Sequence, residues 1–187
     1  AEFLVFTDQF QCYKSRLSDF DDGKASLLGD YLPQKLGFEP GENLVSLQFC
    51  GDYKGFVLFF FENGKAAKVP LSAYETKTNR KKLTGAYSDK SPLVAAMVLE
   101  EDAQIALYSS DGRAAVFSTA QLLPKTTRNT QGVAVMTLKK KAVLRDARLL
   151  EESGIANPGR YRTKTIPSAG MLLKEEDSAD KQQSFEV

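Results

Sequence analysis

The chain alternates short apolar runs with polar turns, and three of these runs begin in the same way. An apolar run, a turn and a second strand-like segment follow one another in "FLVF-TDQF-QCYKSRL", "FVLFFF-ENGK-AAKVPL" and "IALY-SSDGR-AAVFST". Asn-Gly and Asp-Gly between strand-like runs are typical of β-hairpins, and we expect type I′ turns there, in which both central residues have a positive φ. The pattern therefore predicts three hairpins.

Further strand-like runs cover residues 42–50, 91–99 and 132–138. Together with the hairpins they amount to about four short strands in roughly every 50 residues, which is typical of propeller blades. Helical periodicity is confined to residues 144–154, where we expect a short helix that ends at Gly154. The predicted fold class is therefore all-β, with about three propeller-like blades of four antiparallel strands.

The hairpins belong to an internal repeat. Residues 61–85 match residues 109–133 without a gap, with Gly64 on Gly112, and residues 3–20 match residues 56–74. Self-similarity of this kind is the signature of a repeat architecture. The expected repeats cover about residues 3–54, 55–104 and 105–150.

We expect a single domain over residues 1–173, made of these repeats and a C-terminal extension. Few apolar residues follow Leu173, so residues 174–187 are expected to form an acidic, disordered tail. The chain opens on a strand-like run without an initiator methionine, and we expect it to be part of a longer protein.

Charge is spread unevenly along the 187 residues, whose net charge is +1. Residues 1–54 hold five basic and nine acidic side chains (−4), residues 55–148 hold fifteen and eight (+7), and residues 149–187 hold five and seven (−2). A basic middle between acidic ends suggests a polyanionic partner, and a lysine-rich solvated surface is the alternative.

The composition argues against a catalytic or metal centre. Histidine is absent, which removes the commonest general base and the commonest metal ligand. Cys12 and Cys50 lie in apolar, strand-like contexts, where we expect reduced thiols in the core of a cytoplasmic protein. The apolar runs are too short to span a bilayer, so we expect no membrane partner. We also expect no cofactor in this part of the protein.

The segment "TTRNTQGVAVMTL" (126–138), preceded by the "SSDGR" hairpin, resembles the repeat of the C-terminal domain of bacterial type IIA topoisomerase A subunits, that is, gyrase and topoisomerase IV. "ENGKAAKVPLSAYETKTNRKKL" matches the same repeat one copy earlier, and the resemblance covers about residues 3–148. It implies a β-pinwheel of four-stranded blades that exchange a strand with their neighbours and carry a basic rim.

The resemblance also implies a function. We expect this part of the chain to bind duplex DNA without reading its sequence and to bend or wrap it, and to have no enzymatic activity of its own. The parent would be an ATP-hydrolysing type IIA topoisomerase of the bacterial cytoplasm, associated with the nucleoid. Its partners would be the ATPase B subunit, in an A2B2 enzyme, together with the remaining domains of its own chain.

The chain departs from the family in two respects. The glycine-rich heptad Q-R-R-G-G-R/K-G of gyrase subunits does not occur, and "TKTNRKK" (76–82) is the nearest segment. Three repeats are visible, where family members have five or six. These departures favour a topoisomerase IV or gyrase-like subunit of the kind found in low-GC Gram-positive bacteria.

Binding DNA without reading its sequence needs phosphate contacts from cations, hydroxyls, amides and backbone N–H groups, and "KTTRNTQG" (125–132) offers all four. The segment "KTNRKK" (77–82) is the equivalent one repeat earlier, and cations on the hairpins extend the path. The predicted DNA contacts are Lys65, Lys68, Lys77, Arg80, Lys81, Lys82, Arg113, Lys125, Arg128 and Gln131.

Each assignment has a structural alternative. Arg128 and Thr130 would tie one blade to the next, Lys65 and Arg113 would only solvate the hairpins, and residues 138–144 would form an edge strand protected by lysines. Lys14 and Arg16 lie in the acidic first repeat, which we expect to contribute least to DNA binding. A propeller-like scaffold for protein–protein interaction is the alternative function.

Overall fold

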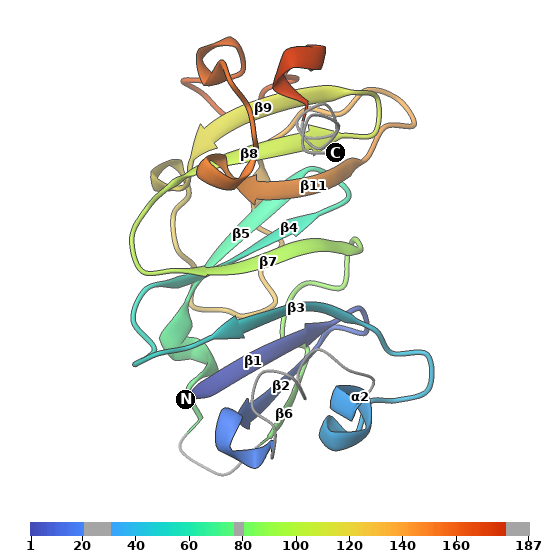
Figure 1. Ribbon diagram of the computed structural model, residues 1–187, viewed down its shortest axis with the longest axis vertical. Helices are drawn as coiled ribbons and strands as arrows, with labels where there is room; N and C mark the ends of the chain where they lie inside the picture. Colours follow the sequence, from blue (N-terminus) through green and yellow to red (C-terminus); the bar gives the residue numbers. More distant parts are fainter. Residues whose placement is uncertain (21–30, 77–80, 179–187) are drawn as a thin grey trace, which may run out of the picture.

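The computed structural model describes residues 1–20, 31–76 and 81–178, and these residues form three four-stranded antiparallel sheets. The sheets are stacked along the long axis of the molecule (Figure 1). The first sheet has the strand order β3–β1–β2–β6, the second β7–β4–β5–β10 and the third β11–β8–β9–β12. None of the helices in the described segments is long and apolar enough to cross a bilayer.

The twelve strands are short, and most have six residues. Their bounds are β1 Glu2–Thr7, β2 Gln11–Arg16, β3 Leu44–Phe49, β4 Phe56–Phe61, β5 Lys65–Pro70, β6 Lys82–Thr84, β7 Leu93–Leu99, β8 Gln104–Ser109, β9 Arg113–Ser118, β10 Val133–Ala134, β11 Leu144–Leu149 and β12 Met171–Leu172. The helical elements are η1 Leu17–Asp19, α2 Tyr31–Leu36, η2 Leu71–Tyr74, η3 Thr119–Gln121, η4 Leu150–Glu152, η5 Pro158–Arg160 and η6 Glu175–Asp177.

Each sheet takes its fourth strand from a later part of the chain, and in the first two sheets this strand follows the next hairpin. β6 lies after the β4–β5 hairpin but pairs with β2, and β10 lies after the β8–β9 hairpin but pairs with β5. In the third sheet, β12 from the C-terminal extension pairs with β9. The strand exchange implied by the family resemblance is therefore present, and the all-β prediction is confirmed.

The apolar run of β4 is explained by its position in the middle of the stack. Val57, Phe59 and Phe61 pack into the core between the first and second sheets. Leu58 and Phe60 point the other way, into the core between the second and third sheets. A strand buried on both faces reads as a continuous apolar run, because neither set of alternate positions reaches solvent.

The outer faces of the stack are covered by the chain's own segments. On the first sheet, Phe20, Leu32 of α2 and Phe38 pack against Phe3 and Tyr13. On the third sheet, the segment that follows β11 supplies the cover. Its members there are Leu150, Ile155, Tyr161 and Leu173, which pack on Ala106, Tyr108, Ala114 and Val116.

One edge strand of each sheet contacts its neighbour, and we call β3, β7 and β11 the inner edge of the stack. Two side chains of β3 bond to the backbone of β7, since Ser46 Oγ donates to Ala96 O (2.7 Å) and Val98 N donates to Gln48 Oε1 (3.1 Å). The opposite edge carries the exchanged strands β6, β10 and β12, and we call it the outer edge. Both edges of β7 are thereby protected from pairing with other chains.

The turn type of the hairpins differs from the prediction. In the second and third hairpins only the glycines, Gly64 (φ 82°) and Gly112 (φ 81°), have a positive φ in the turn, so the turns are not type I′. Gly64 N donates to Phe61 O (3.0 Å), which is the bond of a type I turn followed by a left-handed residue. In the first hairpin Phe10 takes this conformation (φ 62°), and the hydroxyl of Tyr87 accepts its N–H.

Two further expectations are wrong. Residues 144–154 form the strand β11 and the 3-10 turn η4 instead of a helix, because β8 needs an antiparallel partner on the inner edge. The lysines of residues 138–144 lie in a turn that precedes β11, where Lys141 has a φ of 69°, and not in an edge strand.

The packing continues past residue 173, where the acidic tail was expected to begin. Asp177 is fully buried and accepts hydrogen bonds from Asn157 N (2.9 Å) and the Tyr161 hydroxyl (2.6 Å). Arg160 Nη1 lies 3.1 Å from the same carboxylate. Residues 174–178 are thus fixed against the third sheet, and residues 179–187 lie outside the described part of the chain.

Strand exchange requires a glycine at position 132, directly before β10, because there is no room for a side chain. Its φ is +72°, and an added Cβ would lie 2.0 Å from Ala66 O. Gly132→Ala should therefore lower the free energy of unfolding by about 3 kcal/mol, because a left-handed alanine is strained and the β5 backbone has to move. Urea denaturation followed by circular dichroism measures this loss.

Gly159→Ala is the matched control, because an added Cβ there meets nothing within 4 Å. Its cost should stay within about 0.5 kcal/mol. Equal unfolding midpoints for the two variants would show that the close approach of the exchanged strand does not limit stability.

Candidate nucleic-acid interface

The segment 124–132, which we call the box, leads from η3 to β10 along the outer edge of the second sheet. Its course is set at both ends by contacts with β5. Lys125 N donates to Lys68 O (2.9 Å), and Gly132 approaches Ala66 O before the chain enters β10. Side chains of the box that do not touch β5 or η2 are left in solvent, as Lys125 and Gln131 are.

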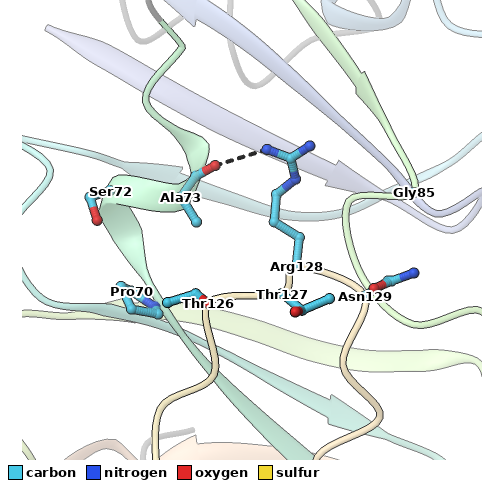
Figure 2. A pocket seen from close by; sticks show the side chains of 8 residues that line it. All are labelled: Pro70, Ser72, Ala73, Gly85, Thr126, Thr127, Arg128 and Asn129. Carbon is cyan, nitrogen blue, oxygen red and sulfur yellow. Dashed lines mark hydrogen bonds between the residues drawn. The ribbon is translucent and has the colours of Figure 1, made fainter.

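The box and η2 enclose an open groove of about 570 Å³ (Figure 2). Hydroxyl, amide and guanidinium groups supply most of its polar lining. The residues around it are Pro70, Ser72, Ala73, Gly85, Thr126, Thr127, Arg128 and Asn129. The groove thus joins residues of the second repeat with residues of the third, about 50 positions apart in the sequence.

Arg128 fastens the box to η2. Its Nη1 donates to Ala73 O (2.9 Å), and the side chain extends from the box toward η2 in Figure 2. Burial raises the pKa of the Tyr74 hydroxyl, and the nearby positive charge of Arg128 opposes this rise. Arg128 thus has a structural role, as in its alternative, but the bond joins the third repeat to the second within one sheet instead of tying one blade to the next. Its guanidinium lies at the wall of the groove.

Lys68 lies inside the molecule, contrary to its prediction as a DNA contact. Its side chain is 5% exposed, and its ammonium donates to Asp102 Oδ1 (2.8 Å) and Thr119 O (3.1 Å). The ammonium also lies 4.4 Å from the ring centroid of Phe56. Since β5 is buried on both faces, its lysine links the second sheet to η3 and offers no accessible charge to a phosphate.

Two other predicted contacts are occupied by internal partners. The ammonium of Lys82 lies 3.3 Å from Glu39 Oε1 and 5.6 Å from the ring centroid of Tyr13. Arg113 Nη1 donates to Gly170 O (3.4 Å), and its Nε lies 3.8 Å from a carboxylate oxygen of Asp111. The carboxylates reduce the charge that these two cations can present to DNA.

The remaining predicted residues fall into three groups. Lys81, Lys125 and Gln131 are exposed, and Lys65 is half-buried at the start of β5. Lys77 and Arg80 lie outside the described residues. Of the predicted contacts, the structure places Arg128 at the groove and leaves Lys125 and Gln131 exposed on the box. Lys81 lies beside the first sheet, where its carbonyl accepts from Lys14 N.

Sequence reasoning missed Ser72 and the carbonyl of Ala73, which form the second wall of the groove. No signal in the box points to them, because η2 belongs to the preceding repeat. Both cysteines are buried, as predicted, and burial raises the pKa of each thiol. In the described part of the chain, no three His, Cys, Asp or Glu side chains are grouped to hold a metal.

Comparison with solved structures identifies the fold. The C-terminal domain of DNA topoisomerase IV matches with a TM-score of 0.75 over 94% of this chain and 60% of that chain, at 18% identity. The DNA gyrase A C-terminal domain matches with a TM-score of 0.62 over 95% and 62%, at 16% identity. The chain has the β-pinwheel fold of the C-terminal domains of type IIA topoisomerase A subunits.

Further comparisons agree with this β-pinwheel fold. The E. coli ParC C-terminal domain matches with a TM-score of 0.60 over 94% of this chain and 78% of that chain, at 10% identity. The DNA gyrase A subunits of Mycobacterium bovis and Mycobacterium tuberculosis are each 23% identical over 168 residues, or 87% of this chain. The chain spans 20% of the length of these two relatives. No family model matches the chain.

The Lys68–Asp102 pair makes a testable contribution to stability. Hydrogen bonds from Lys68 and Thr119 hold the pKa of Asp102 below its usual range, so this stabilisation exists above about pH 4 and is lost as pH falls through the lowered pKa. Asp102→Asn should cost about 1 kcal/mol at neutral pH, because the buried ammonium loses its counter-ion, while solvent already screens the carboxylate, which is 43% exposed.

Urea denaturation across a pH series measures this cost, with Asp89→Asn as the control at an exposed pair. The difference between wild type and Asp102→Asn should shrink below about pH 4. A difference that does not change with pH would contradict the ion-pair account.

Proposed function

We propose that this β-pinwheel binds duplex DNA without reading its sequence, as the C-terminal domain of a type IIA topoisomerase A subunit, and bends or wraps it. The observation that carries the proposal is the groove between η2 and the box, at the outer edge of the second sheet. The fold supports this function through its relatives, which are domains of gyrase A and topoisomerase IV.

The chemistry of the groove suits a phosphodiester. Phosphate oxygens are bound by arginine, hydroxyl, amide and backbone N–H groups, and these contacts carry no sequence information. Arg128, Thr127 and Asn129 supply three of these groups on one wall, and Ser72 supplies a hydroxyl on the other. Lys125 and Gln131 are exposed on the same segment and would extend the contact.

The architecture also suits binding that ignores base sequence. Reading bases requires an element that enters a DNA groove, commonly an α-helix in the major groove. The α-helix of the described chain, α2, has six residues and packs with its Leu32 on the first sheet. A rim of loops and short strands instead follows the DNA backbone, where every sequence presents the same phosphates.

The proposal extends to the whole protein. The parent would be an ATP-dependent topoisomerase of the bacterial cytoplasm, in which an ATPase B subunit works with the other domains of the parent chain. We assign the cleavage and rejoining of DNA to those other parts. The β-pinwheel would hold and bend the DNA on which they act.

Fluorescence anisotropy of a labelled duplex of about 40 base pairs, titrated at several salt concentrations, tests the proposal. Each phosphate contact contributes about −0.9 to the slope of log affinity against log salt. Lys125→Glu should weaken binding and flatten this slope by about 1, because it removes one exposed cation of the box.

Lys90→Glu is the matched control, since it changes the net charge equally at an exposed lysine already paired with Asp89. It should bind as wild type does. Wild-type association that is weak and insensitive to salt would contradict the proposal and favour the alternative of a protein–protein scaffold.

A further inference from the structure

The segment 150–178 covers the outer face of the third sheet, at the end of the stack that is uppermost in Figure 1, and we call it the cap. We infer that the cap prevents a second copy of this chain from stacking on that face, and that the buried carboxylate of Asp177 is the latch that holds the cap closed. The inference concerns the end of the stack and does not depend on DNA binding. Repeat proteins need terminal segments with a polar outer side to stay soluble as single copies.

The face under the cap is equivalent to a face that does stack. The second sheet turns three apolar side chains toward the third sheet, Leu58, Phe60 and Ala66. The residues 48 positions later are Ala106, Tyr108 and Ala114, and these point outward from the third sheet into the core under the cap. The outward face of the third sheet thus has the register of a face that packs against another sheet. Left uncovered, a contiguous apolar surface of this kind is an interaction site.

The cap occupies the place in which a further sheet would begin. After β3 the chain forms the β4–β5 hairpin of the next sheet, and after β7 it forms the β8–β9 hairpin. After β11 it forms η4 and η5 instead, and Leu150, Ile155 and Tyr161 of this stretch pack on the third sheet. Within the described residues, the succession of inner strand and new hairpin therefore stops at β11.

The end of the cap nevertheless keeps the exchanged strand of a repeat. Gly170 directly precedes β12, has a φ of 72°, and an added Cβ would lie 2.3 Å from Ala114 O. Gly132 before β10 has the same φ, and the corresponding distance is 2.0 Å, to Ala66 O. Each of these glycines also donates its N–H to the hydroxyl two residues earlier, at 3.1 Å for Gly170 and 3.4 Å for Gly132. The cap is thus a partial repeat, in which the exchanged strand is kept and the hairpin is replaced by a cover.

Backbone hydrogen bonds fix the middle of the cap to β9. Val116 N donates to Tyr161 O (2.8 Å), and Thr163 N donates to Val116 O (2.9 Å). The side chain of Tyr161 is buried in the core between the cap and the third sheet. Opening of the cap would break the bond of the Val116 amide, so hydrogen exchange at this amide reports whether the cap is closed.

Asp177 joins the middle of the cap to its end. The carboxylate accepts from Asn157 N (2.9 Å), the Tyr161 hydroxyl (2.6 Å) and Arg160 Nη1 (3.1 Å). Its side chain is fully buried, and removal of a buried acceptor costs more than the bonds themselves because the donors are left unpaired. Glu176 pairs with the same arginine, but its side chain is 53% exposed. The carboxylate of Asp177, and not that of Glu176, therefore acts as the latch.

A second copy is the partner that fits the uncapped face. The three sheets of one chain already stack face to face through apolar cores. The opposite end of the stack is covered by Phe20, Leu32 and Phe38. The surface that matches an uncapped third sheet is thus the same face of another uncapped copy. A contact between identical faces is two-fold symmetric and closes as a dimer.

Analytical ultracentrifugation and amide hydrogen exchange of Asp177→Ala test the inference. Wild type should stay monomeric at all protein concentrations, and Asp177→Ala should shift toward a dimer as its concentration rises. Exchange at Val116 should be at least about tenfold faster in the variant, because buried hydrogen bonds to a charged group are lost. Glu176→Ala is the matched control, since it removes the exposed carboxylate and keeps Asp177, and it should match wild type in both measurements.

Two further substitutions locate the contact and guard against misfolding. Tyr108→Lys in the Asp177→Ala background places like charges on the two facing sheets, so it should restore the monomer without restoring slow exchange at Val116. Tyr161→Phe removes one donor to Asp177 and keeps the packed ring. It should raise exchange and association in the same direction as Asp177→Ala, by a smaller factor.

Each of the opposite results would refute the inference. Faster exchange without association in Asp177→Ala would show that the cap protects no stacking face, and unchanged exchange would show that Asp177 is not the latch. Association that persists with Tyr108→Lys, or dimers of wild type, would place the contact elsewhere. If Asp177→Ala loses its β-sheet circular dichroism signal altogether, the same two measurements on Tyr161→Phe decide.

Discussion

Completion of each sheet by a strand from a later part of the chain is the constraint on which the rest of the structure depends. The exchanged strands have only two or three residues, so pairing alone holds them weakly. Close backbone approach adds to it, since Gly132 and Gly170 each lie against a carbonyl of the strand they join. In the first sheet β6 pairs over three residues, with Lys82 opposite Tyr13.

A consequence is that a repeat in the sequence is not a blade in the structure. The first two blades each contain a hairpin and an inner strand of one repeat and an outer strand of the next, and the third takes its outer strand from the C-terminal extension. The charge of a blade therefore differs from the charge of its repeat. Residues 1–54 are acidic overall, yet the sheet they build receives Lys81 and Lys82 from the basic middle of the chain. A basic segment of one repeat therefore lies in the blade that the preceding repeat mainly builds.

The sequence pattern was sufficient for what is local. Short apolar runs separated by polar turns predict the hairpins, because strand and turn preferences depend on near neighbours in the sequence. Contacts between residues far apart in the sequence determine the conformation of residues 144–149 and the burial of Lys68. Residues 144–149 have helix-like spacing of Leu144 and Ala147, but β8 needs an inner partner and recruits them as a strand. Lys68 reads as a surface cation, but both faces of β5 are covered.

The candidate groove shows that a residue of the box can have a structural role as well as a place in a possible ligand-binding site. Arg128 of the box donates to the carbonyl of Ala73 in η2. One blade further on, the direction of the bond is reversed, since Gln121 Nε2 of η3 donates to Lys164 O (3.1 Å) in the segment that leads to β12. In the second and third sheets, the segment that leads to the exchanged strand is thus hydrogen-bonded to the 3-10 helix that follows the hairpin of the same sheet. Arg128 is committed to this structural bond, while exposed neighbours such as Lys125 remain available to the proposed DNA partner.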